Sequence, residues 1–313
     1  MSINALLLWP LIASAALGLT GSRLGRTLPP AVAVRLLTTA ALVSALATGF
    51  ALAVAAFAAL ARVPIVSAVG HWSVTALDTG QHVPAPAGVL AGATVTALVV
   101  ATARRAVTGG RELVTAALIC RDLDDAGGGL VVIVDEHPDA YALPGIRGRI
   151  VVSTAMLHAL SSDERRVLLA HEAAHLARGH HLYLQVAELS AAANPLLRPV
   201  ARAIATAVER EADEIAAAEV GDRQLAARAL ARAGLARAAA ATHGRTLVGA
   251  LGGADGNVVA RAHALLAPPP PRRRILAASL TAVILVTSAV SLATAKQTER
   301  RFETAQAVYT RHT

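Results

Sequence analysis

The feature that most restricts the fold is a set of four stretches that are long, apolar and nearly free of charge. A helix of about 20 residues crosses the ~30 Å hydrocarbon core of a bilayer. The composition agrees, because 55% of the residues are hydrophobic and only 16% are charged, fewer than in a typical soluble domain. The sequence therefore predicts a multi-pass membrane protein with four helical spans, over about 3–20, 36–60, 87–103 and 275–295. The third stretch is short and contains Gly88 and Gly92, so an interfacial or packed helix is the alternative there.

Arginines near the ends of these spans predict the orientation of the chain in the cell membrane. Cytoplasmic loops carry an excess of Lys and Arg. Such residues follow the first span (Arg23, Arg26, Arg35), follow the third (Arg104, Arg105, Arg111) and precede the fourth (Arg272, Arg273, Arg274). We therefore expect three spans in 1–103, a cytoplasmic segment 104–271, and the fourth span with a short tail in 272–313. Loop 61–86 and the tail after 295 then lie outside, although the tail carries Lys296, Arg300, Arg301 and Arg311.

One short motif, His171-Glu172-Ala173-Ala174-His175, indicates the chemistry. Two histidines four positions apart lie on one face of a helix, so both imidazoles reach the same ion while Glu172 lies beside it. This is the H-E-x-x-H arrangement of zinc proteases, with two metal ligands and a carboxylate that activates water. Chance produces the pattern in roughly 1 of 100 chains of this composition, so the surrounding residues have to support it.

The residues around the motif predict a partly buried helix near 162–178. Ser161 and Glu164 have the spacing of a capping box, and Gly179 suits the helix end. The alternative is a solvated helix with two surface histidines, which the alanine-rich and apolar character of the segment disfavours.

A zinc site of this kind needs a third protein ligand and an open position for water. The best candidate is Glu209, 34 residues after His175, on a second predicted helix. Asp213 lies four residues further on the same face and is expected to accept the free ring N–H of a ligand histidine. We expect Glu211 and Glu214 to be solvated on other faces. The alternative is that all four acids form a charged helix exterior.

The formal net charge of +8 raises the question of nucleic-acid binding. Aromatic residues make up only 3% of the chain, and no motif for base stacking or groove reading is present. Since the arginines cluster at membrane edges, anionic lipid headgroups are the expected partner and nucleic acid is not. Cys120 is the only cysteine, so no internal disulfide forms.

H-E-x-x-H followed by E-x-x-A-D at 209–213 resembles the pattern of membrane-embedded gluzincin peptidases. Two groups are similar: the BlaR/MecR-type antirepressor peptidases, and the HtpX/CAAX-prenyl proteases as the nearest relatives. Three spans before the motif and one after it favour the first group. Asn194-Pro195-Leu196 looks like its Asn-Pro-Leu between the zinc helices. Further similar runs are 142–145, 149–153 and 171–180, and the resemblance covers about 110–267.

Two features depart from the BlaR/MecR pattern. Ala191-Ala192-Ala193 stands where those proteins usually have aromatic residues, and about 18 residues follow the last span. We therefore expect no large penicillin-binding sensor domain and no direct sensing of β-lactams by one.

The resemblance implies an α+β, mostly helical, minigluzincin-like domain inserted between transmembrane helices. We expect the segment 182–206 either to dip into the membrane face or to form a packed core hairpin. The β-strand 149–153 is implied to bind the substrate at its edge. The full set of expected elements is helix 104–122, strand 130–135, a turn over 138–148, strand 149–153, and helices near 162–178, 182–193, 198–220, 222–241 and 257–266.

The implied activity is that of a zinc endopeptidase acting on a protein or peptide. Zn²⁺ is held by His171, His175 and Glu209, with Glu172 as the general base. The implied substrate is a cytosolic repressor-like protein. HtpX-like quality control of membrane proteins and a non-catalytic membrane scaffold are the alternatives, and the oligomeric state is left open. Candidate donors for the oxyanion are Arg261, His180, His181, His243, His263, Tyr141 and Tyr183.

Overall fold

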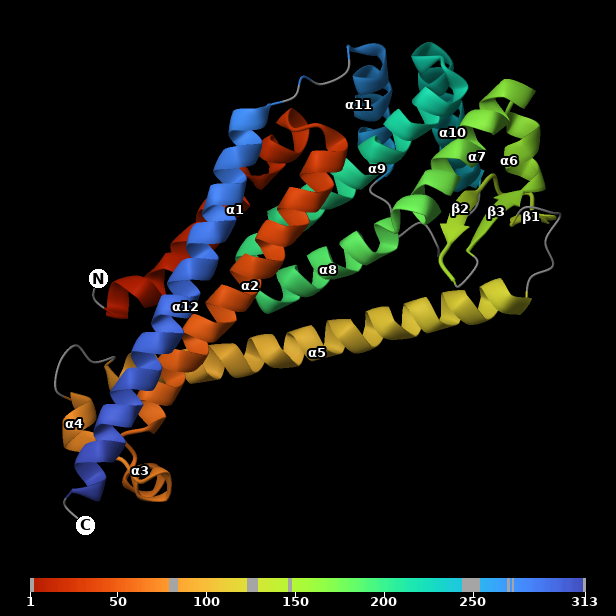
Figure 1. Ribbon diagram of the computed structural model, residues 1–313. Coiled ribbons are helices and arrows are strands. Elements are labelled where there is room, and N and C mark those ends of the chain that lie inside the picture. Colours follow the sequence, from red (N-terminus) through yellow and green to blue (C-terminus); the bar gives the residue numbers. More distant parts are fainter. Residues whose placement is uncertain are drawn as a thin grey trace.

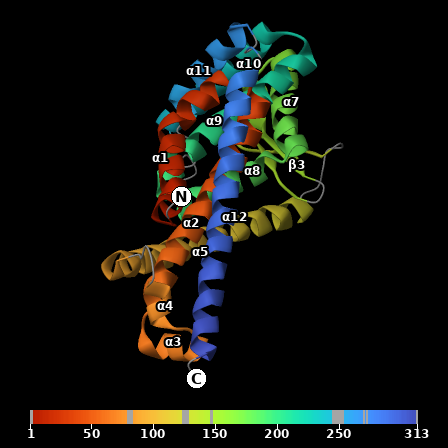
Figure 2. The same ribbon diagram turned by 60° about the vertical axis from the view of Figure 1, so that its left-hand side comes forward.

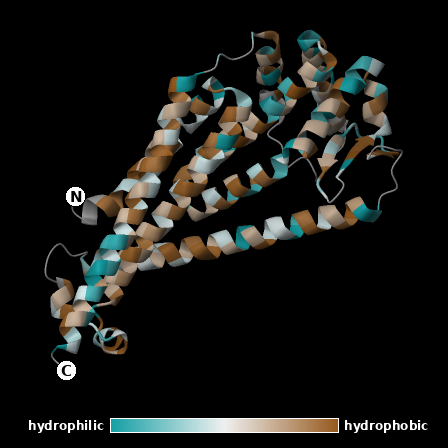
Figure 3. Ribbon diagram, in the orientation of Figure 1, coloured by the Kyte–Doolittle hydropathy of each residue, from teal (hydrophilic) through white to brown (hydrophobic). Residues whose placement is uncertain are grey.

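A computed structural model describes residues 3–78, 84–122, 129–145, 148–243, 254–268, 271 and 273–311 (Figure 1). Arg272 and the side chain of His243, both named above, lie outside this description. In the described chain, four helices are long and apolar enough to cross a membrane, as predicted (Figure 3). They are α1 (Ile3–Thr27), α2 (Pro30–Leu60), α5 (Ala85–Asp122) and α12 (Arg274–Thr310).

All four helices are longer than the predicted spans, and α5 and α12 exceed them most. Helix α5 continues without a break through 103, so the expected span 87–103 and the expected helix 104–122 are one element. Helix α12 includes most of the segment that was expected to be a tail after 295. In both places the chain holds no proline, and it is rich in Ala and Arg, which are strong helix formers. Hydropathy identifies only the apolar part of a helix. The helix propensity of the following residues determines how far the helix continues.

The loop 61–86 contains two short helices, α3 (Pro64–Gly70) and α4 (Val74–Asp78), which the sequence did not predict. The backbone N–H of Ser73 donates to the carbonyl of Ala305 in α12 at 3.1 Å. The ring of Trp72 lies 5.2 Å from that of Phe302. This loop and the end of α12 therefore pack together at one end of the molecule (Figures 1 and 2). The contact agrees with the prediction that both segments lie on the same side of the membrane.

A small sheet has the strand order β1-β3-β2, with β1 (Leu130–Ile133) parallel and β2 (Ala140–Leu143) antiparallel to β3 (Arg149–Ser153). The expectation that 149–153 binds substrate at its edge is wrong, because β3 is the central strand and both of its edges are already paired. Strand β2 lies inside the predicted turn 138–148. Its four residues are too short for the alternation of polar and apolar residues to be recognised in sequence.

Helix α7 (Ser162–Arg178) begins and ends as its sequence predicts. Ser161 accepts from the backbone N–H of Glu164, and the Glu164 carboxylate accepts from that of Ser161 at 2.9 Å. Gly179 ends the helix with a φ of 62°, a conformation that glycine adopts without strain. The other helical elements are α6 (Thr154–Ala159), α8 (His180–Ala193), η1 (Pro195–Leu197), α9 (Arg198–Val220), α10 (Arg223–His243) and α11 (Ala254–Leu266).

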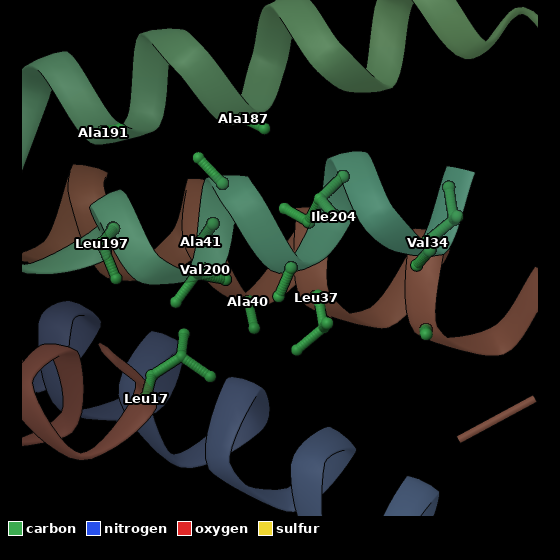
Figure 4. Close-up of a cluster of buried hydrophobic side chains, with 14 of the residues drawn as sticks. Leu17, Val34, Leu37, Ala40, Ala41, Ala187, Ala191, Leu197, Val200 and Ile204 are labelled. Carbon is green, nitrogen blue, oxygen red and sulfur yellow. The ribbon is translucent and has the colours of Figure 1, made fainter. Parts of the chain in front are cut away.

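The hairpin α8–η1–α9 shares one hydrophobic core with α1, α2 and α12, three of the helices that are long and apolar enough to cross a membrane. This is the packed-core alternative considered for 182–206. In Figure 4, Val200 and Ile204 of α9 lie against side chains of α2, and Leu17 belongs to α1. The close approach of α1 depends on three glycines that face η1 and α9: Gly18, Gly21 and Gly25. A Cβ on Gly18 would lie 2.3 Å from the carbonyl oxygen of Leu196. The helix that carries Glu209 is thus packed against two helices that are long and apolar enough to cross a membrane.

Candidate metal centre

Helix α7 presents His171 and His175 on one face, with their Nε2 atoms 3.1 Å apart. Helix α9 brings Glu209 to the same place. Its carboxylate oxygens lie 3.7 Å from His171 Nε2 and 3.6 Å from His175 Nε2. One ligand atom from each residue lies within 4.8 Å of the others. The structure therefore brings together the three side chains that the sequence singled out from two separate helices.

These separations suit a zinc ion. Zinc binds His nitrogen at 2.0–2.1 Å and carboxylate oxygen at about 2.0–2.2 Å in tetrahedral geometry, which puts neighbouring ligand atoms roughly 3.3 Å apart. The three observed distances lie close to this value. The set also combines two neutral nitrogens with one carboxylate, as catalytic zinc sites do. The residues present fit the metal that the motif implies.

Asp213 fixes the orientation of the first histidine. Its Oδ1 lies 3.1 Å from His171 Nδ1, and its side chain is 5% exposed. A proton held on Nδ1 by this carboxylate leaves the lone pair of Nε2 free for a metal. Arg261 in turn donates to both Asp213 oxygens at 2.7 Å and lies 2.8 Å from Glu209 Oε2. One guanidinium therefore holds the carboxylates of both acids that α9 directs at the site.

Glu172 lies buried beside this group, with 7% of its surface exposed. Burial raises the pKa of Glu172 to about 7, whereas the charges of His171 and Arg237 and a backbone hydrogen bond from Ala142 act to lower it. A carboxyl group with a pKa near the working pH is well matched to accept and return a proton.

The two histidines differ electrostatically. Burial opposes protonation of His171, but hydrogen bonds to Asp213 and Glu209 outweigh it and raise its pKa to about 9. Burial and the neighbouring His171 lower the pKa of His175 to about 4. The pKa of Glu209 is lowered, since His171 and Arg261 outweigh the effect of burial. The raised pKa of His171 means that a metal competes with a proton for this ring, which couples metal binding to pH.

A cavity of about 580 Å³ opens beside these groups and is lined by residues of β2, α7, α8, α9, α10 and α11. Among the candidate oxyanion donors in the described chain, Tyr141, His181 and Arg261 line it. All three guanidinium nitrogens of Arg261 already pair with carboxylates. Tyr183 packs against the bundle core, and His263 is exposed away from the cavity. Tyr141 and His181 are therefore the candidates that remain.

The expectation that Glu211 is solvated is wrong, whereas Glu214 is partly exposed and ion-paired. Glu211 is 5% exposed, and its carboxylate lies 3.5 Å from His180 Nε2. Glu214 pairs with Arg223, with Nη2 and Oε1 3.0 Å apart. The reason is that α9 is covered by α7, α10 and α11 as well as by the bundle, so its faces meet other helices. The sequence feature that points to the pairing of Glu211 with His180 is the position of His180, a third histidine directly after Gly179, which ends α7.

Two further residues at the cavity had no signal in the sequence. Arg237 of α10 lines it and donates to the carbonyl of Ala140 at 2.9 Å. The outer edge of β2 adjoins it through Ala142. Both positions depend on how α10 and β2 pack against α7. This packing cannot be predicted from a local sequence pattern.

Part of the chain is similar to a known family. Residues 121–192 match the sequence model of Peptidase family M48. This region contains the sheet and the H-E-x-x-H helix and ends before Glu209. The match supports a peptidase of the M48 type, and it does not confirm the finer resemblance to BlaR/MecR-type peptidases. No curated protein and no solved structure matches this chain.

Proposed function

We propose that this chain is an integral membrane zinc metalloendopeptidase that hydrolyses peptide bonds of a protein substrate in the cavity between β2, α7 and α9. The single observation that carries the proposal is the convergence of His171, His175 and Glu209 around one point, beside the buried carboxylate of Glu172. The resemblance of residues 121–192 to Peptidase family M48 supports the same reaction.

In this proposal His171, His175 and Glu209 hold the metal, and Asp213 and Arg261 hold the ligands. Zinc bound there would polarise the scissile carbonyl and lower the pKa of a bound water towards ~7. Glu172 takes the proton of the attacking water and later delivers it to the leaving amine. Tyr141 and His181, which line the cavity, are the candidates to donate a hydrogen bond to the oxyanion.

The substrate chain is proposed to pair with the outer edge of β2. An exposed strand edge binds an extended peptide through backbone hydrogen bonds, with specificity coming from side-chain pockets. Strand β2 is an edge strand beside the cavity, and Ala142 on it adjoins Glu172. The carbonyl of Ala140 is already occupied by Arg237. The N–H of Ala142 already donates to Glu172. We therefore propose that pairing begins at the carbonyl of Ala142, next to the proton-transferring group.

The proposed substrate is a cytosolic repressor-like protein, with the catalytic site on the cytoplasmic side of the plasma membrane. One observation favours the second role, quality control of membrane proteins: the helix that carries Glu209 is packed against α1 and α2. The site is thus attached to the membrane bundle. Substrates trapped by a Glu172→Gln variant distinguish the two roles, since soluble regulators support the first and membrane proteins the second.

The decisive experiment compares the wild type with Glu172→Gln, both purified in detergent. Zinc content is measured by mass spectrometry, and cleavage is measured with an unfolded protein such as casein. The wild type is expected to bind one zinc and to cleave. Glu172→Gln is expected to keep zinc and lose cleavage, because the ligands remain while the base is absent. Cleavage at the wild-type rate by the variant would reject Glu172 as the base, and a wild type without zinc would support the non-catalytic scaffold.

A further inference from the structure

A third histidine, which is buried, lies directly behind His175. His180 is 1% exposed, and its Nδ1 faces His175 Nδ1 at 3.0 Å. Its other ring nitrogen, Nε2, faces Glu211 Oε2 at 3.5 Å and has no hydrogen-bond partner of standard geometry among the described residues. Arg178 lies 3.8 Å from the other oxygen of Glu211. A line of polar groups thus runs from the candidate metal ligand to a buried carboxylate on α9.

The positions of the protons along this line follow from the chemistry of imidazole. A neutral histidine that offers Nε2 to a metal carries its proton on Nδ1. In His175 this N–H points at Nδ1 of His180, which therefore has to be the acceptor. His180 then carries its own proton on Nε2, the atom that faces Glu211. Each ring thus has one tautomer that satisfies its neighbours, and the Glu211 carboxylate selects it.

We propose that His180 and Glu211 are positioning residues of the metal centre, which hold His175 in the ring orientation and tautomer that expose Nε2. The inference rests on the proposed function, since it takes His175 as a metal ligand. Neither residue touches the reacting atoms, so both act through His175.

The first ligand histidine has a matching arrangement. Asp213 accepts directly from His171 Nδ1 and is paired with Arg261. Glu211 supports His175 through His180 and is paired with Arg178. Helix α9 therefore supplies one ligand at position 209 and two supporting carboxylates, at 211 and 213. Residues in this supporting role typically contribute 10- to 100-fold to metal affinity.

The test uses the full-length protein in detergent and compares His180→Leu with His180→Asn. Leucine fills the space but accepts no hydrogen bond, whereas asparagine places an oxygen near the position of Nδ1. Zinc affinity is measured by competition with a chelator, and the visible absorption spectrum of bound Co²⁺ reports the ligand geometry. His180→Leu is expected to lose about 10- to 100-fold in zinc affinity and to change the Co²⁺ spectrum. His180→Asn is expected to recover most of both.

Glu211→Leu and Glu211→Gln test the far end of the line in the same assays. Glu211→Leu is expected to weaken zinc binding, and Glu211→Gln, which keeps an acceptor oxygen, to weaken it less. Glu214→Gln is the matched control, because it alters a paired glutamate of the same helix that faces Arg223. It is expected to leave zinc affinity unchanged. If His180→Leu does not fold, the two Glu211 variants decide the question.

Equal losses in His180→Leu and His180→Asn, or equal losses in the two Glu211 variants, would overturn the proposal, because packing alone would then explain the effect. Wild-type zinc affinity in His180→Leu would overturn it as well. Failure of the proposed function is a separate outcome, since the wild type itself would then bind neither zinc nor Co²⁺.

Discussion

Asn194 donates a hydrogen bond from Nδ2 to the hydroxyl of Ser14 at 2.9 Å, although 180 positions separate the two residues. A second bond joins Asn194 to Thr48 at 3.2 Å. All three side chains are at most 2% exposed. The Asn-Pro-Leu turn between α8 and α9 is therefore tied to α1 and α2 by a buried polar network. This contact gives the motif a physical role, because it sets how deeply the hairpin of the candidate site sits in the bundle.

Removal of this network should destabilise the protein. We expect Asn194→Ala to lower the free energy of unfolding by about 1–3 kcal/mol, because buried hydroxyl groups lose a partner. Thermal unfolding in detergent measures the effect. A double-mutant cycle with Ser14→Ala should give a coupling of about 0.5–2 kcal/mol. Strictly additive effects of the two substitutions would show that the hydrogen bond contributes nothing.

The glycine face of α1 offers a test of packing. Gly18→Ala places a methyl group against the Leu196 carbonyl, and we expect a loss of about 1–3 kcal/mol through overpacking. Alanine is the better helix former by up to about 1 kcal/mol, so the sign of the effect is informative. Gly49→Ala in α2 is the control, because nothing lies within 4 Å of its added Cβ. It should be neutral or slightly stabilising. The same result for both variants would contradict the close approach of α1 and η1.

The third ligand is tested by metal affinity. Glu209→Gln should lower zinc affinity by at least tenfold, because a neutral amide replaces a carboxylate ligand, while Glu214→Gln should not. Chelator competition measures both. Equal zinc retention in the two variants would assign the third ligand to another residue.

Arg261 neutralises two buried carboxylates, so its loss should affect stability and metal binding together. Arg261→Leu is expected to cost on the order of 3–5 kcal/mol, because Asp213 and Glu209 lose their common partner. Arg261→Lys keeps the charge but not the forked geometry that reaches both acids. It should fold and bind zinc more weakly than the wild type. Unchanged zinc affinity in Arg261→Lys would show that the forked contact of Arg261 with Asp213 and Glu209 does not support metal binding.

The capping box of α7 predicts a pH dependence of stability. Burial alone would raise the pKa of Glu164, but hydrogen bonds from Ser161 and the charge of Arg232 outweigh it and lower the pKa below its usual value. A carboxylate with a lowered pKa stabilises the fold above its unfolded pKa of about 4.3 and loses this effect as the pH falls through the folded pKa.

Glu164→Gln should therefore cost on the order of 1 kcal/mol at pH 7 and progressively less towards pH 3. The measurement is the difference in unfolding free energy between wild type and variant across this pH range. A difference that is constant with pH would mean that the charge of Glu164 is not involved.

Local patterns in the sequence determined much of this protein. Uncharged apolar runs marked the four helices that are long and apolar enough to cross a membrane. The Ser161–Glu164 spacing and Gly179 bounded α7, and the i, i+4 spacing put His171 and His175 on one face. These features depend on hydrogen bonds and side-chain neighbours within a few residues, so they can be predicted from a single sequence. The location of Glu209 and Asp213 on one face of the same helix could be predicted for the same reason.

Tertiary packing alone decided the rest. The central place of β3, the cavity edge formed by β2, and the burial of Glu211 against His180 depend on contacts between elements far apart in sequence. The link from Asn194 to Ser14 is of the same kind. A side chain on α9 has the same local spacing whether its face meets water or another helix. Which faces are buried is set by the way α1, α2, α7 and α10 surround that helix, because burial is a property of the assembled core.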